Sequence, residues 1–91
     1  VVGMTAPGMT VRLRYFASVR EAIGNGSETW ATRAATLAEL RAELQARGGP
    51  YAAALAEGRA VRMALDQVMA EGEMALPDNA EVAFFPPVTG G

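Results

Sequence analysis

Apolar and polar residues alternate at a spacing of two within residues 10–17. One face of this segment holds Val11, Leu13 and Tyr15, and the other holds Arg12, Arg14 and Phe16. Successive side chains of an extended chain point to opposite faces, so the pattern predicts a half-buried strand. Residues 27–32 predict a second strand, and the intervening Asn25-Gly26 pair is typical of a tight turn. We therefore expect the fold to open with an antiparallel pair of strands.

Two segments have the spacing of a capping box. In this motif, a side chain at the start of a helix accepts a hydrogen bond from the N–H three residues later. Ser18 and Glu21 predict a short helical turn that ends at Gly24. Thr36 and Glu39 predict the start of a second and longer helix.

This longer helix should bury a stripe of leucines. The residues that recur at helical spacing are Leu37, Leu40 and Leu44. Glu43 and Arg47 lie four residues apart and predict an exposed ion pair. The Gly-Gly-Pro sequence of residues 48–50 should end the helix. Residues 51–57 predict one more short helix, stopped by Gly58.

The second half of the chain predicts three further strands. The third strand is indicated by the alternation of Val61, Met63 and Leu65 with Arg62 and Ala64. Asp66-Gln67 should turn the chain, and residues 68–70 then form a brief edge strand. The last strand should begin near Glu81 and end at Pro86-Pro87, because proline cannot donate a backbone hydrogen bond.

The order of these elements predicts an α+β fold with a mixed sheet of four to five strands and one main helix packed on one face. This is the β-grasp, or ubiquitin-like, arrangement. We expect a single domain over residues 9–91, with a flexible C-terminal tail at residues 88–91. Residues 1–8 show no periodicity, and we expect them to be a disordered N-terminal extension.

Composition then limits the chemistry. The 91 residues include no cysteine and no histidine, which argues against a thiolate nucleophile, a histidine base or a metal site. A net charge of −2 argues against a nucleic-acid partner. Apolar stretches fall well short of the roughly 20 residues that cross a bilayer, so we expect no membrane partner and a cytoplasmic location.

Three apolar residues are out of phase with the expected core. Val82 and Phe84 share one face of the last strand, which places Phe85 on the other face. Phe16 and Met69 are out of phase in the same way. If the first, fourth and fifth strands are neighbours, these residues could form an exposed patch for a partner; alternatively, each belongs to a minor cluster covered by a loop.

The end of the sequence combines a stiff segment with a slim one. Pro86-Pro87 favours an extended backbone, and Val88-Thr89-Gly90-Gly91 follows. Glycine has no Cβ, so a Gly-Gly end could enter a tunnel too narrow for other residues and present the Gly91 carboxylate to another protein's active site. The alternative is an ordinary frayed terminus.

Two motifs carry a resemblance to a known family. The ending is Phe84-Phe85-Pro86-Pro87-Val88-Thr89-Gly90-Gly91, and the opening is Tyr15-Phe16-Ala17-Ser18-Val19-Arg20-Glu21. From Met9 onward the chain resembles the MoaD/ThiS superfamily of β-grasp sulfur carriers, and within it the small subunits of molybdopterin synthase. It departs from the usual family pattern at Asp66-Gln67 and in the turn of residues 78–81.

The resemblance implies a function carried by the Gly91 carboxylate. An E1-like enzyme would adenylate it with ATP, and a sulfur donor would convert it to a thiocarboxylate. Two such carriers, in a heterotetramer with the large synthase subunit, would turn cyclic pyranopterin monophosphate into molybdopterin. The chain itself would bind no cofactor and would be a non-catalytic subunit.

By the same resemblance, the partner-binding residues are Phe16, Arg20, Met69, Phe85, Pro86, Pro87, Val88 and Thr89, with Gly90 and Gly91 as the reacting end. Two alternatives stay open. The chain could carry sulfur for another pathway, such as thiamine synthesis, cysteine synthesis or tRNA thiolation, or it could be a protein modifier.

Overall fold

A computed structural model describes residues 8–56 and 58–87 of the chain. The elements are β1 (Met9–Tyr15), α1 (Ala17–Ile23), β2 (Ser27–Thr32), α2 (Leu37–Gln45), α3 (Gly49–Ala54), β3 (Arg62–Leu65), β4 (Val68–Ala70) and β5 (Glu81–Phe85). The predicted extension and tail lie almost wholly outside the described residues, since only Gly8, which precedes β1, belongs to either.

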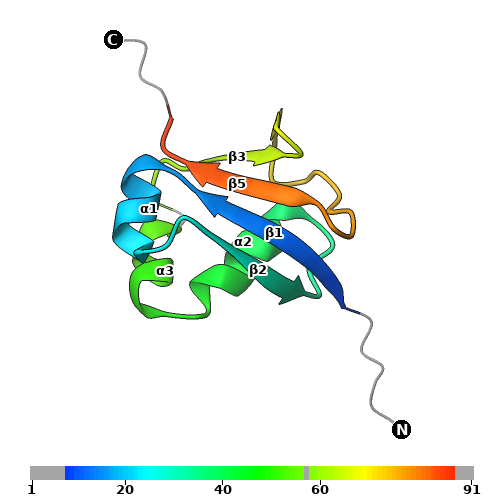
Figure 1. Cartoon of the computed structure of the whole chain (residues 1–91), viewed down its shortest axis with the longest axis horizontal. Helices are drawn as coiled ribbons and strands as arrows, with labels where there is room; N and C mark the ends of the chain where they lie inside the picture. The colour runs from blue at the N-terminus through cyan, green and yellow to red at the C-terminus, as the bar shows by residue number, and fades with distance from the viewer. Residues whose placement is uncertain (1–7, 57, 88–91) are drawn as a thin grey trace, which may run out of the picture.

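The described strands form one mixed sheet in the order β2-β1-β5-β3-β4. β1 and β5 run parallel at its centre, and the remaining neighbours are antiparallel. In Figure 1, α2 crosses behind the sheet, and α1 and α3 lie together near one end of β1. The β-grasp prediction is confirmed, with five strands, α2 as the main helix and two shorter helices beside it.

The core lies between the sheet and α2, where the predicted phases hold. Val11, Leu13 and Tyr15 of β1 are buried, as are the three leucines of α2. Phe84 of β5 is fully buried, and its ring stacks on that of Tyr15 with 6.0 Å between centroids. β1 and β5 therefore each bury one face against the helices and turn the other face away from the core.

The predicted capping box at Ser18 is wrong. The helix begins two residues earlier than that box requires: Phe16 is the N-cap residue, and its carbonyl oxygen accepts from Val19 N and Arg20 N. The pairing of β1 with β5 continues for one residue past the strand, as Phe16 N donates to Phe84 O at 3.1 Å. Ala17 then turns the chain with a φ of 51°, which leaves Ser18 inside the first turn.

The capping box of α2 is confirmed. Thr36 Oγ1 accepts from Glu39 N at 3.2 Å. Glu39 Oε1 in return accepts from Ala35 N at 2.8 Å, one residue before the cap. The first bond satisfies the Glu39 N–H, which a helix start would otherwise leave unpaired, and the second ties the residue before the cap to the first turn of the helix.

The predicted Glu43–Arg47 pair does not form, because both side chains reach across to β2 instead. Glu43 accepts hydrogen bonds from Trp30 Nε1, Thr32 Oγ1 and Arg33 N. Arg47 Nη1 binds Glu28 Oε2 at 2.9 Å. Partly buried carboxylates on β2 and α2 thus join the helix to the sheet edge, which an exposed pair within the helix would not do.

Glu28 is the centre of a small polar cluster. Its Oε2 accepts from Tyr15 Oη at 2.7 Å and Tyr51 Oη at 3.1 Å, as well as from Arg47. Burial and the bond to Glu28 raise the pKa of Tyr15, which stays protonated as a donor. The Arg47 guanidinium lies between two rings, 4.5 Å from the Trp30 centroid and 3.8 Å from that of Tyr51.

The third helix begins and ends earlier than residues 51–57. Gly48 has a φ of 77°, which turns the chain sharply and lets α3 start at Gly49 with Pro50 in its first turn. Its C-terminal end is held by Arg41 of α2, whose guanidinium donates to Leu55 O and Ala56 O. The helix ends where these two carbonyl oxygens accept hydrogen bonds from the Arg41 side chain.

Asp66-Gln67 forms the predicted turn between β3 and β4. Both residues have positive φ values, 49° and 71°, as in a type I′ hairpin. β5 begins at Glu81 and ends at Phe85, immediately before Pro86, as predicted.

Candidate functional site

A groove lies on the face of the sheet that is turned away from the core. It has a volume of about 510 Å³ and is lined mainly by apolar side chains. The lining residues are Phe16, Ala17, Ala64, Gln67, Glu81, Ala83, Phe85, Pro86 and Pro87.

Strand register explains the shape of this groove. Ala83 of β5 pairs with Ala64 of β3, and both side chains point away from the core face, so two small residues lie side by side in the sheet. Larger side chains border them. Phe85 comes two residues after Ala83 in β5, so it lies on the same face of the sheet. Phe16 is brought beside the end of β5 by its backbone bond to Phe84. The result is a shallow floor between bulky borders.

Four predicted partner-binding residues meet in this groove: Phe16, Phe85, Pro86 and Pro87. Phe16 is 41% exposed, and Phe85 is half-buried and outside the core cluster. The two prolines follow directly after the last residue of β5. The structure therefore places an apolar surface directly at the base of the C-terminal segment.

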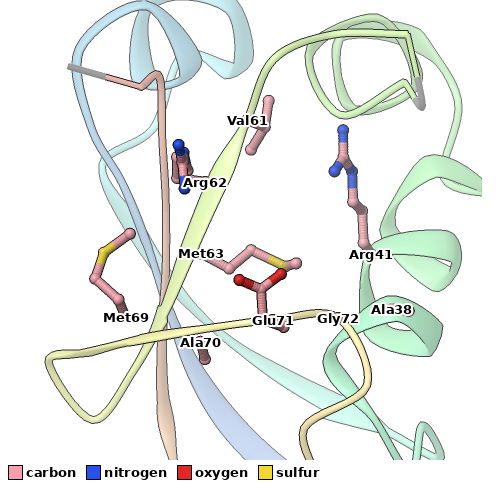
Figure 2. Close-up of a pocket in the computed structure, with 9 residues that line it drawn as sticks. All are labelled: Ala38, Arg41, Val61, Arg62, Met63, Met69, Ala70, Glu71 and Gly72. Atoms are coloured by element: carbon pink, nitrogen blue, oxygen red, sulfur yellow. The ribbon is translucent and has the colours of Figure 1, made fainter. Parts of the chain in front are cut away.

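Met69 does not line the groove. The predicted patch required the first, fourth and fifth strands to be neighbours, and this requirement is not met. β3 separates β4 from β5, so the fourth and fifth strands are not neighbours. Met69 pairs with Ala64 and is 57% exposed. Figure 2 shows Met69 and Arg62 on the side of β3 away from α2, whereas Met63 points toward that helix. Met69 thus belongs to the same sheet face as the groove but lies one strand beyond it.

Arg20 is exposed on α1 and does not line the groove. Its side chain packs near Gly26, where a Cβ would lie 3.2 Å from Arg20 Cδ. Val88, Thr89, Gly90 and Gly91 lie outside the described residues.

Sequence reasoning missed the two alanines of the floor and the polar border. Ala64 and Ala83 occupy outward positions of strands whose neighbouring outward positions are large, and this alternation of sizes was the available signal. Glu81 lies on the border beside Arg12, with 3.8 Å between Nη1 and Oε1. The Arg14 guanidinium carbon lies 5.5 Å from the centroid of the Phe16 ring, a cation–π contact.

The two carboxylates whose pKa is lowered, Glu28 and Glu43, lie on the helix side of the sheet, away from the groove. Burial alone would raise the pKa of Glu43, but hydrogen bonds from Thr32, Trp30 and the Arg33 N–H lower it. These interactions are structural. Among residues 8–56 and 58–87, no group of three or more Asp, Glu, His or Cys side chains is placed to hold a metal ion. No helix in that part of the chain has the length and apolarity to cross a membrane.

Comparisons with known proteins agree with this geometry. The model of the ThiS family matches residues 13–91. The molybdopterin synthase sulfur carrier subunit of Escherichia coli (strain K12) is 37% identical over 81 residues, which are 89% of this chain and 99% of that protein.

Two solved structures extend the comparison. The Haloferax volcanii HVO 2177 protein is 27% identical with a TM-score of 0.78, and the match covers 100% of this chain and 94% of that one. A protein–protein complex of subunits 1 and 2 of the molybdopterin-converting factor from Helicobacter pylori 26695 contains a chain 29% identical, with a TM-score of 0.60. That match covers 91% of this chain and 100% of the other.

Proposed function

The chain belongs to the ThiS family, and on that premise we propose that it is the sulfur carrier subunit of a molybdopterin synthase. The observation that carries the proposal is the 37% identity to a protein of that description, over 99% of its length. The apolar groove at the base of the C-terminal segment supports it, since a carrier must bind the proteins that load and unload it.

The proposed chemistry takes place at the Gly91 carboxylate. A carboxylate is unreactive toward sulfur nucleophiles until it has a good leaving group. Attack of one carboxylate oxygen on the α-phosphate of ATP would release pyrophosphate and leave an acyl-adenylate. A donor of sulfur at the oxidation level of sulfide would then attack the acyl carbon, form the C–S bond and displace AMP, which leaves a thiocarboxylate. An E1-like adenylating enzyme supplies this catalysis in our proposal, because the sequence offers neither a cysteine nor a histidine for it.

The carrier's own contribution is to bind and to orient. Phe16, Phe85, Pro86 and Pro87 would pack against the partner, and the two prolines would direct the following residues away from the sheet. We place Arg20 and Met69 at the margin of this surface. Val88 and Thr89 would lead Gly90-Gly91 into the active site of the large synthase subunit, where cyclic pyranopterin monophosphate receives the sulfur.

The large subunit is the partner that we propose, in a heterotetramer of two carriers and two large subunits. The Helicobacter pylori complex of subunits 1 and 2 supports this choice, because one chain of that complex shares the fold of this chain.

Mass spectrometry tests the chemistry. After incubation with the adenylating enzyme, ATP and a sulfur source, the carrier should gain about 16 Da, since sulfur replaces one oxygen. Adducts on target lysines would instead favour a protein modifier. A variant without Gly90-Gly91 should gain no mass and form no molybdopterin with the large subunit, and molybdopterin formation by that variant would refute the proposal.

A further inference from the structure

The open face of the sheet is basic, although the chain as a whole has a net charge of −2. Its outward positions include Arg12 and Arg14 of β1 and Arg62 of β3, all exposed. Within the described strands the carboxylate at an outward position is Glu81, which lies beside Arg12, and Asp66 of the β3–β4 turn accepts a hydrogen bond from Glu81 N. Charge on this face therefore has the opposite sign to the charge of the whole chain.

Two of these arginines stand on opposite sides of the apolar groove. In the register of the sheet, Arg14 pairs with Ala83 from the β1 side, and Arg62 pairs with Phe85 from the β3 side. The contact with the Phe16 ring holds the Arg14 guanidinium near the aromatic end of the groove. Figure 2 shows Arg62 on the side of β3 that is turned away from α2.

Neither guanidinium has a carboxylate partner within the described residues. The ion pairs there are Arg12–Glu81 and Arg47–Glu28, and neither includes Arg14 or Arg62. Both arginines lie on interior strands, β1 and β3, and no helix of the described residues covers the outward faces of these strands. A guanidinium beside an apolar groove suits an interface, where arginine and aromatic side chains are enriched and where border charges select the partner.

We propose that Arg14 and Arg62 form a basic clamp on the groove, and that the protein it fits presents an apolar centre flanked by carboxylates. This inference rests on the proposed function and specifies the chemistry of the partner surface: the large subunit binds here through Asp or Glu side chains that pair with these two arginines. Charge complementarity then adds to the apolar contact at Phe16 and Phe85 and speeds the encounter of the two chains.

The test measures affinity for the large synthase subunit from the same organism by isothermal titration calorimetry. The double variant Arg14→Glu/Arg62→Glu should raise Kd about tenfold or more at about 50 mM NaCl, because two attractions become repulsions. For the wild type, Kd should rise several-fold between about 50 and about 500 mM NaCl, as screening shortens the range of the charges. In the variant this salt dependence should reverse, because added salt then screens a repulsion instead of an attraction.

The matched control is Arg33→Glu/Arg59→Glu, which makes the same charge change at exposed positions outside the strands, after β2 and before β3, and away from the residues that pair with β5. Its Kd should stay within about twofold of the wild type. Should the first variant fail to fold, as judged by circular dichroism, Arg14→Gln/Arg62→Gln decides the matter, with a Kd expected to rise about threefold to fivefold.

The outcomes separate the two proposals. Suppose that the wild type forms molybdopterin with the large subunit, but the Arg14/Arg62 double variants bind it as tightly as the control does. The clamp is then refuted and the proposed function stands. If the wild type neither binds the large subunit nor supplies sulfur to it, the proposed function fails and the clamp fails with it.

Discussion

Replacing Glu28 with glutamine should destabilise the fold in a manner that depends on pH. One oxygen of this carboxylate accepts three hydrogen bonds, from Tyr15, Arg47 and Tyr51, at 2.7, 2.9 and 3.1 Å. A hydrogen bond to a charged acceptor contributes about 1.5–3 kcal/mol and one to a neutral acceptor about 0.5–1.5 kcal/mol. Glutamine keeps the shape but removes the charge, so each bond loses about 1 kcal/mol.

The side chain of Glu28 is 18% exposed, so solvent screens part of this difference. We therefore expect Glu28→Gln to lower the free energy of unfolding by about 2 kcal/mol at pH 7. For a domain of this size, that loss corresponds to a melting temperature lower by roughly 8–16 °C.

The pH dependence follows from the pKa of Glu28. Burial alone would raise this pKa, but the bonds from Tyr15, Arg47 and Tyr51 outweigh it and hold the pKa below the ordinary value of 4.5. A carboxyl whose pKa is lowered by folding stabilises the protein above its unfolded pKa, and that stabilisation disappears as pH falls through the folded value. The gap between wild type and Glu28→Gln should therefore be full at pH 7 and shrink below pH 4.5.

Urea unfolding at pH 7 and at about pH 3, followed by far-UV circular dichroism, measures this gap. Glu21→Gln is the matched control, because Glu21 is exposed on α1, and its effect should stay within about 0.5 kcal/mol. A gap that is absent at pH 7, or that is equally large at both pH values, would show that the charge of Glu28 does not stabilise the cluster.

Three further changes test the groove, the core and the turn. Phe85→Asp should weaken binding of the large subunit at least about tenfold, because a carboxylate does not suit an apolar groove; loss of the fold, seen by circular dichroism, would place Phe85 in the core instead. Leu40→Ala should lower the free energy of unfolding by about 2–5 kcal/mol in urea, since Leu40 is fully buried; a loss below about 1 kcal/mol would contradict that position. Gln67→Gly should raise stability by about 0.5–1 kcal/mol in thermal unfolding, because a φ of 71° strains glutamine but not glycine; a lower melting temperature would contradict this account of the turn.

Local patterns predicted most of the elements. The alternation in β1 and the leucine spacing in α2 identified buried side chains correctly, because each depends only on the repeat of its own backbone. The turn at Asp66-Gln67 and the end of β5 before Pro86 could also be predicted, since both depend on residues adjacent in the sequence.

The errors arose where a local signal competed with a contact from elsewhere in the chain. The capping box at Ser18 gave way to the bond between Phe16 N and Phe84 O, which fixes where β1 ends. The Glu43–Arg47 pair gave way to partners on β2. In each case a partly buried contact between elements outweighed an exposed contact within one element.

The sequence by itself determined the class of fold, the inward faces of its main elements and the family motif that ends at Gly91. The tertiary structure alone decided the order of the strands. That order puts β3 between β4 and β5, so Met69 lies away from the groove, and it brings Arg14 and Arg62 to opposite sides of β5. The physical reason is that spacing along a chain records which way a side chain faces, whereas strand order depends on how distant segments pair and pack.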